Sequence, residues 1–264
     1  KHYDINLKSE LNIWINNDFI LGDVFFIEIN KVNKIIMRQI PRVNGGIVVI
    51  NPHNGDVLAL SGGYSFKISE FNRSTQARRQ PGSAFKPFVY MAALDEGYTP
   101  STLILDAPYV VDQGPGLPKW KPANYTDEFY GLTTMRTGIE KSRNLMTVRL
   151  AHKLGMEKIL KIAKNFGLSN DLTTQLSMSL GSGLVTLIDI TNAYGIIANG
   201  GNEINPKIIS SIFSKDGEII FNSTNTSCIG CNIKDINSEI KIPKINKKIK
   251  KIIDPKIAYQ MTSM

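Results

Sequence analysis

The sequence predicts an α+β fold, in which an antiparallel hairpin is combined with several helices. Two almost wholly apolar runs, residues 47–50 and 57–60, flank turn residues 51–56, and this pattern predicts a hairpin whose strands are covered on both faces. Several later segments repeat apolar residues at three- and four-residue spacing, which is typical of helices. A hairpin followed by such helices indicates the α+β class.

The composition is that of an ordinary globular protein, because 264 residues with 42% apolar and 20% charged side chains are enough to bury one sizeable core. The formal charge is +8, but eight basic residues fall within residues 234–256, a polar tract without aromatic side chains. Such a tract is typical of a solvated segment, so we expect no nucleic-acid partner. Attraction to an anionic membrane or cell-wall polymer stays open.

No apolar run is long enough to cross a bilayer, and the chain begins at Lys1 without a signal peptide or a methionine. We therefore expect an internal piece of a longer protein. The two cysteines, Cys228 and Cys231, have the spacing of half a zinc site or of a redox pair, but no second pair exists and the histidines are scattered. We expect a loop disulfide or free thiols there, and neither a metal nor a cofactor.

Residues 1–44 are expected to contain short strands, notably residues 24–29 and 34–39, which are too little for a separate domain. They are either the end of a small β domain or a linker, or a pair of edge strands of the main domain. The hairpin of residues 45–63 comes next, and a polar loop, residues 65–80, then leads to the first helix.

That helix begins where Pro81-Gly82 interrupts the chain and an apolar run with helical spacing follows. The spacing places Ser83 at the N-terminus of a buried helix, and Pro87 suits the first turn. Lys86 follows Ser83 by three residues, so its amine lies on the same helix face within reach of the Ser83 hydroxyl. The helix dipole and burial both disfavour an ammonium, which predicts a nucleophile beside a base.

The alternative is that Ser83 only caps the helix and Lys86 is a solvated surface residue. A bare Ser-x-x-Lys pattern is weak, since Ser238-Glu-Ile-Lys241 also matches it in a polar segment without an apolar helix. The apolar helix that follows Ser83 favours the first match. In that case the Ser83 backbone N–H is a candidate oxyanion donor.

Residues 98–125 contain five prolines and little helical periodicity, so they predict a long loop. The aromatic residues Trp120 and Tyr125 either lie at a substrate rim or pack beneath this loop. Two helices, residues 133–142 and 145–155, are expected next, joined by Ser142-Arg-Asn144. Either Ser142 or Asn144 is simply the N-cap of the second helix, or the pair belongs to the site of Ser83.

The remaining chain predicts further helices, a glycine turn that lacks the context of a phosphate loop, a hairpin and a low-complexity segment. These are the helices of residues 157–166, 186–199 and 254 onward, the turn of residues 178–183, the hairpin of residues 211–221 and the segment of residues 222–251.

The run Arg79-Gln-Pro-Gly-Ser-Ala-Phe-Lys-Pro-Phe88 resembles the nucleophile motif of class A penicillin-binding proteins, which polymerise and cross-link peptidoglycan. Residues 71–76, 112–120 and 138–144 are similar to the same family, and the resemblance is dense from about residue 45 to residue 201. It implies a serine β-lactamase/transpeptidase-like fold for residues 45–264, in which an antiparallel sheet is packed by helices and an all-helical region completes the domain. It also implies that residues 1–44 are the end of a small oligonucleotide/oligosaccharide-binding-like β-barrel.

The resemblance implies a D,D-transpeptidase in which Ser83 is acylated by the stem peptide and Lys86 is the base. Ser142 would relay a proton to the leaving amine, and Asn144 would hold Lys86 and the substrate carbonyl. Ser-x-Asn is itself a weak pattern, since Ser223-Thr-Asn225 also matches it. The implied partners are peptidoglycan stem peptides, β-lactams and possible cell-wall synthesis proteins, at the periplasmic face of the inner membrane. The membrane anchor and a glycosyltransferase half would lie in the parent protein.

The third motif of the family, Lys-Thr/Ser-Gly on a sheet strand, is missing from these 264 residues, and the nearest string is Lys215-Asp-Gly217. We therefore expect the sheet to be incomplete and this piece by itself to be weakly active or inactive. The alternatives are a hydrolase, either a D,D-carboxypeptidase or a serine β-lactamase, and a non-catalytic module that binds peptidoglycan or a partner. The class A flanks favour transfer.

Overall fold

A computed structural model describes residues 24, 26–31, 35–38, 40–112, 114–116, 118–168, 171–223, 227–229, 244–246 and 250–264. The chain forms two compact units, Lys1–Asn44 and Gly45–Met264. In the first, β1 (Phe26–Ile29) pairs antiparallel with β2 (Ile35–Arg38), and Arg38 Nε lies 2.7 Å from Glu28 Oε2. That this unit is the end of a small β-barrel stays a prediction.

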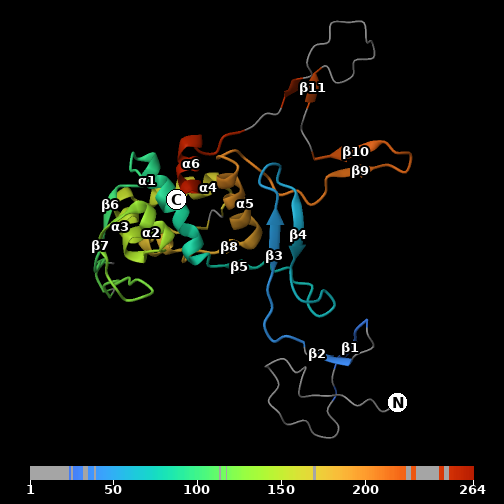
Figure 1. Ribbon diagram of the computed structural model, residues 1–264, viewed down its shortest axis with the longest axis horizontal. Coiled ribbons are helices and arrows are strands. Elements are labelled where there is room, and N and C mark those ends of the chain that lie inside the picture. The colour runs from blue at the N-terminus through green and yellow to red at the C-terminus, as the bar shows by residue number, and fades with distance from the viewer. Residues whose placement is uncertain are drawn as a thin grey trace. The chain divides into compact units, whose positions relative to one another are not determined.

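The second unit combines short antiparallel sheets with helices, as Figure 1 shows, and the α+β class is confirmed. None of its described helices is both long and apolar enough to cross a membrane. The strands are β3 (Ile47–Ile50), β4 (Val57–Ser61), β5 (Arg78–Arg79), β6 (Leu103–Asp106), β7 (Gly131–Thr134), β8 (Val185–Thr186), β9 (Ser211–Phe213), β10 (Ile219–Asn222), β11 (Ser227–Ile229) and β12 (Lys244–Asn246). The helices are η1 (Gly82–Phe85), α1 (Lys86–Asp95), α2 (Met135–Glu140), α3 (Asn144–Leu154), α4 (Met156–Asn165), η2 (Leu176–Leu180), α5 (Leu187–Ala198) and α6 (Pro255–Ser263).

Helix α1 is the centre of the core, because all of its residues from Lys86 to Leu94 are buried. It packs against α3, α4 and α6, which lie around it in Figure 1. The ring of Phe88 lies 5.3 Å from that of Phe85 and 5.6 Å from that of Phe166, centroid to centroid. Pro87 occupies the first turn, as predicted, where its missing N–H leaves no carbonyl unpaired. A helix buried on every side gives its first turn a fixed position.

The hairpin of β3 and β4 is present, but the expectation that both of its faces are covered is wrong. Helix α5 packs against β3, and alternate residues of that strand are only partly exposed. Ile47 and Val49 remain 55% and 41% exposed, and Leu58 on β4 is 66% exposed. Among the described residues this sheet has two strands and a helix on one face, so apolar sequence in both arms did not produce burial on both sides.

Two other segments differ from the sequence-based expectation. Strand β6 lies inside residues 98–125, which were expected to be a loop, and it pairs with β7 at residues 131–134. The helix expected from residue 133 therefore begins only at Met135. Thr134 is its N-cap and accepts from the Thr137 N–H at 3.3 Å. β-Branched threonines suit both a strand and a cap, which explains why periodicity alone placed this boundary too early.

The later helices and the β9–β10 hairpin are confirmed within a residue or two. Helix α6 begins as predicted, with Asp254 Oδ1 accepting from the Lys256 N–H at 2.8 Å and Pro255 in the first turn. Most of the low-complexity segment lies outside the described residues, as do Cys231 and the side chain of Cys228. The predicted state of the two cysteines therefore stays a prediction.

Candidate active site

The candidate site begins at the N-terminal end of α1. Gly82, with φ of +56°, opens the 3-10 turn η1, and this turn presents the exposed side chain of Ser83. Lys86 is the first residue of α1 and is only 1% exposed. The two side chains therefore share one helical turn, with the hydroxyl accessible and the amine buried.

The Lys86 amine is held by the segment between α2 and α3. Its Nζ donates to the Ser142 carbonyl oxygen at 2.6 Å, to Ser142 Oγ at 2.9 Å and to Asn144 Oδ1 at 2.7 Å. Ser142 Oγ in turn donates to Ser83 Oγ at 3.0 Å. The structure thus brings all four residues together, but the link between Lys86 and Ser83 runs through the Ser142 hydroxyl. The sequence predicted a more direct contact.

Burial lowers the pKa of the Lys86 amine from its ordinary value of 10.5 to about 8. The three oxygens that Lys86 contacts belong to a carbonyl, a hydroxyl and an amide, so none of them carries a charge that would favour the ammonium strongly. A pKa near 8 leaves about a tenth of the amine neutral at pH 7. The neutral amine has a lone pair and is able to accept a proton.

Ser142 has an unusual backbone, because its φ is +52°, in the left-handed region. This conformation costs a residue other than glycine about 1–2 kcal/mol. The end of α2 supports it, since the Ser142 N–H donates to Ile139 O at 3.0 Å and the Arg143 N–H donates to Gly138 O at 2.8 Å. Backbone strain that the surroundings maintain is concentrated at functional sites in proteins.

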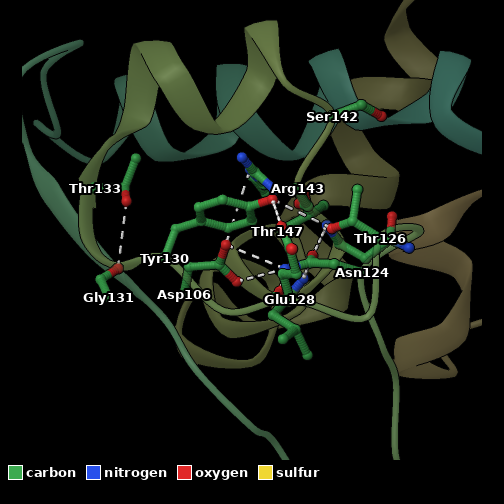
Figure 2. Close-up of polar contacts among 12 residues, drawn as sticks. Asp106, Asn124, Thr126, Glu128, Tyr130, Gly131, Thr133, Ser142, Arg143 and Thr147 are labelled. Atoms are coloured by element: carbon green, nitrogen blue, oxygen red, sulfur yellow. Dashed lines mark hydrogen bonds and ion pairs between the residues drawn. The ribbon is translucent and has the colours of Figure 1, made fainter.

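Asn144, the first residue of α3, is oriented by the loop before β7. Its Nδ2 donates to Ala123 O at 2.8 Å, which turns Oδ1 toward Lys86. Its backbone N–H donates to Asn124 Oδ1 at 2.9 Å. Figure 2 shows Asn124 within a polar network that includes Asp106 and Arg143. Sequence reasoning missed Asn124 and Asp106, because they lie in a segment without periodicity and about 20 or more residues before their partners.

The other side of the Ser83 turn is held by the glycine turn that ends η2. The Gly82 N–H donates to Gly181 O at 3.3 Å, and Gln80 Nε2 donates to Ser182 O at 3.1 Å. The hydroxyl of Tyr194 on α5 donates to Ala84 O at 3.0 Å. The sequence excluded a phosphate loop here but gave this turn no other role. The closely spaced Gly181 and Gly183 were the sequence feature that could have indicated a close approach of two backbone segments.

The two aromatic residues expected at a substrate rim lie in different settings. Trp120 is partly buried and exchanges two backbone hydrogen bonds of 2.9 Å with Val111. The Tyr125 side chain is fully exposed and directly follows Ala123 and Asn124, the residues that contact Asn144. Tyr125 is thus adjacent in sequence to the site, whereas Trp120 lies farther along the loop. Their roles in substrate binding stay predictions.

A serine hydroxyl linked through a second serine to a buried lysine, at the start of a central helix, defines a serine acyl-transferase type of site. Comparison with known proteins agrees with this class. The family model of the penicillin binding protein transpeptidase domain matches residues 45–263. The chain belongs to the penicillin-binding protein transpeptidase family.

Relatives and solved structures cover most of the chain. Penicillin-binding protein 1A of Rickettsia typhi is 49% identical over 243 residues, which are 92% of this chain and 31% of that protein. The crystal structure of penicillin-binding protein 1A from Haemophilus influenzae matches with a TM-score of 0.77 at 30% identity, over 90% of this chain and 37% of that one. PonA1 of Mycobacterium tuberculosis, in complex with penicillin V, has the same fold, with a TM-score of 0.67 at 22% identity over 84% of this chain and 54% of that one. The chain spans about a third of the length of the curated relatives it matches.

Proposed function

We propose that this chain carries the acyl-transfer chemistry of a peptidoglycan D,D-transpeptidase, which cross-links stem peptides through an acyl-serine intermediate. The observation that carries the proposal is the hydrogen-bonded series from Ser83 through Ser142 to Lys86, in which an exposed hydroxyl is connected to a buried amine of lowered pKa. Membership of the transpeptidase family supports the choice of the D-Ala–D-Ala peptide as the acyl donor.

In the acylation step, Ser83 Oγ attacks the carbonyl carbon of the penultimate D-Ala. Its proton passes to Ser142 Oγ while the Ser142 proton passes to the neutral Lys86 Nζ, a reversal of the direction in which the two hydroxyl groups donate in the structure. The Ser83 backbone N–H is our candidate for one donor to the oxyanion. When the peptide C–N bond breaks, the proton returns through Ser142 to the amine of the leaving D-Ala.

In the second step, the amine of a neighbouring stem peptide attacks the Ser83 ester. The amine loses a proton to Lys86 through Ser142, and Ser83 leaves with a proton, so the site returns to its starting state. Asn144 keeps Lys86 in place through Oδ1 in both steps. If water is the acceptor instead, the same residues perform the hydrolysis of a D,D-carboxypeptidase or β-lactamase. Relatives named as penicillin-binding protein 1A favour transfer.

We also propose that β-lactams acylate Ser83, since the strained lactam amide takes the place of the scissile peptide. The complex of PonA1 with penicillin V supports this for a protein of the same fold. The parent protein would act at the periplasmic face of the inner membrane, where the stem peptides are, and would carry a glycosyltransferase half as the class A resemblance implies. Trp120 and Tyr125 are our candidates for contacts with the stem peptide.

The proposal is tested in the full-length protein by labelling with a fluorescent penicillin and by intact mass. We expect Ser83→Ala to abolish the penicilloyl adduct, because the nucleophilic oxygen is removed. Ser238→Ala is the matched control, since it also removes a serine that precedes a lysine by three residues, and it should label like the wild type. A full adduct on the Ser83→Ala variant would overturn the assignment. No labelling of the wild type would favour the non-catalytic module.

A further inference from the structure

The N-terminus of α3, which carries Asn144, lacks a cap from its own sequence. Its N-cap residue is Arg143, whose side chain makes no capping hydrogen bond and has no acceptor. The first N–H groups of a helix have no partner within the helix and need one from elsewhere. Here Asn124 supplies it, because its Oδ1 accepts from the N–H of Asn144 at 2.9 Å and from that of Leu145 at 3.3 Å.

Asn124 is itself held on its other side. It is 4% exposed, and its Nδ2 lies 2.8 Å and 3.1 Å from the two carboxylate oxygens of Asp106 and 2.9 Å from Glu128 O. Asp106 is fully buried at the end of β6. A carboxylate only accepts hydrogen bonds, so the NH₂ side of Asn124 must face Asp106 and its oxygen must face α3. Figure 2 shows Asn124 beside Asp106 in this network.

Asp106 also approaches the residue between Ser142 and Asn144. Its Oδ2 lies 3.9 Å from Arg143 Nε, and the Arg143 guanidinium stacks on the Tyr130 ring, 3.3 Å from its centroid. Ser142, with its strained backbone, and Asn144 therefore flank a residue whose guanidinium approaches a buried carboxylate and an aromatic ring. Together with the bond from Asn144 Nδ2 to Ala123 O, these contacts act on the short segment that carries Ser142 and Asn144, the two residues that contact Lys86.

We propose that Asn124, oriented by Asp106, is a positioning residue that keeps Ser142 and Asn144 in hydrogen-bonding distance of Lys86 and Ser83. The inference rests on the proposed function, because it assigns to this pair the alignment of the proton relay. Asn124 does not contact the reacting atoms. Its loss frees the start of α3, so Ser142 Oγ spends less time between Lys86 and Ser83 and the acylation step slows.

The experiment measures single-turnover acylation of the full-length protein by a fluorescent penicillin at several concentrations. The amplitude gives the fraction of molecules with a competent fold, while the rate constant at saturation reports the chemistry of those molecules. We expect Asn124→Ala to lower the saturating rate constant about 10- to 100-fold, in the range found when residues that orient site groups are removed. The half-saturating concentration should change little. A purely structural role would lower the amplitude and leave the rate constant unchanged, which would overturn the inference.

The matched control is Asn54→Ala. Asn54 makes the same two kinds of bond, since its Nδ2 donates to Asp56 Oδ2 at 2.6 Å and its Oδ1 accepts from the Asp56 N–H at 3.0 Å, but it lies in the β3–β4 turn. We expect its rate constant to equal that of the wild type. A comparable loss in Asn54→Ala would show that removing any such asparagine slows the protein, and it would overturn the inference.

A charge exchange tests the pair even if Asn124→Ala fails to fold. Asn124→Asp places two carboxylates together and should lower the rate constant at least as much as Asn124→Ala. Adding Asp106→Asn restores one donor and one acceptor between the two positions, so the double variant should recover at least about tenfold of the loss. A double variant as slow as the single one, or a single variant at the wild-type rate, would overturn the inference. Both results leave the proposed function intact as long as Ser83 of the wild type is labelled, whereas loss of that labelling contradicts the function itself.

Discussion

Lys86 combines complete burial with contact to oxygens only, and this combination decides its chemistry. An ammonium in this position loses its hydration and receives three hydrogen bonds in return, from groups without a full charge. Desolvation therefore outweighs the hydrogen bonds, and the pKa falls to about 8. The same three contacts leave the amine directed at Ser142, so the base of the proposed mechanism is already oriented before a substrate arrives.

The acylation rate should consequently depend on pH with a single apparent pKa near 8. Because the pKa of Lys86 is lowered to about 8, the neutral base forms as the pH rises through that value, and each pH unit below it should cost about tenfold in rate. The measurement is the rate constant of penicillin acylation from pH 6 to pH 9.5, corrected for spontaneous hydrolysis of the β-lactam. A rate that is flat across this range would contradict the role of Lys86.

Lys86→Arg serves as the control for the same profile. The guanidinium keeps its proton throughout this range, so the variant should label very slowly at every pH and should show no rise near pH 8. Retention of the pH-dependent rise in Lys86→Arg would mean that another group titrates. The pH dependence would then have to be reassigned.

At the scale of elements, the turn between η2 and β8 holds the turn that carries Ser83. Gly181 has φ of +77°, and a Cβ added there would lie 2.2 Å from Gly82 O and 2.5 Å from Gly82 N. These are backbone atoms of the residue immediately before Ser83, so they cannot move aside without displacing Ser83. The close approach of the two turns is therefore possible only with glycine at residue 181.

We expect Gly181→Ala to lower the acylation rate constant about a hundredfold, because a displacement of the order of 1 Å at a reacting group has an effect of that size. Gly217→Ala is the matched control: it has φ of +84° in the β9–β10 turn, but an added Cβ would have nothing within 4 Å. It carries the same backbone strain without the collision, so its rate constant should be that of the wild type. Equal rate constants for both variants and the wild type would contradict the positioning role of Gly181.

The elements themselves show what local sequence is able to predict. Helix α1 and the turn before it were predicted because Pro81-Gly82 and the following apolar residues act within one short window. The hydrogen bond from the Asn144 N–H to Asn124 Oδ1 was not predicted. A helix cap supplied by a distant segment cannot be recognised from the sequence around the helix. Likewise, Thr133 and Thr134 fit a strand or a helix start, and only pairing with β6 decides between them.

At the scale of the whole unit, the helical core is well covered and the sheets are not. The helices around α1 enclose the core, whereas each described sheet has only two strands. The apolar sequence of β3 and β4 predicted cover on both faces, and the structure shows cover by α5 on one. Hydrophobic sequence indicates that a surface is to be buried, but it does not identify the segment that buries it, because that depends on contacts distant in the sequence.

The β9–β10 hairpin presents another exposed apolar surface. Side chains from both of its strands are exposed, including Phe213 at 59%, Ile219 at 61% and Ile220 at 67%. A two-stranded hairpin is marginally stable alone, and an uncovered apolar edge is a template for pairing with another chain. The 264-residue chain expressed by itself should therefore self-associate, with an apparent mass that rises with protein concentration in light scattering after size-exclusion chromatography.

Two substitutions on this hairpin separate its contribution from general instability. Phe213→Ser with Ile220→Ser removes exposed apolar area without opening a cavity, so the variant should associate less and keep its melting temperature within a few degrees. Lys215→Ser in the turn of the same hairpin is the control, and it should associate as the unmodified chain does. A monodisperse unmodified chain at high concentration would contradict the predicted self-association. Undiminished association of the double variant would place the contact elsewhere, with the exposed face of β3 and β4 as the next surface to test.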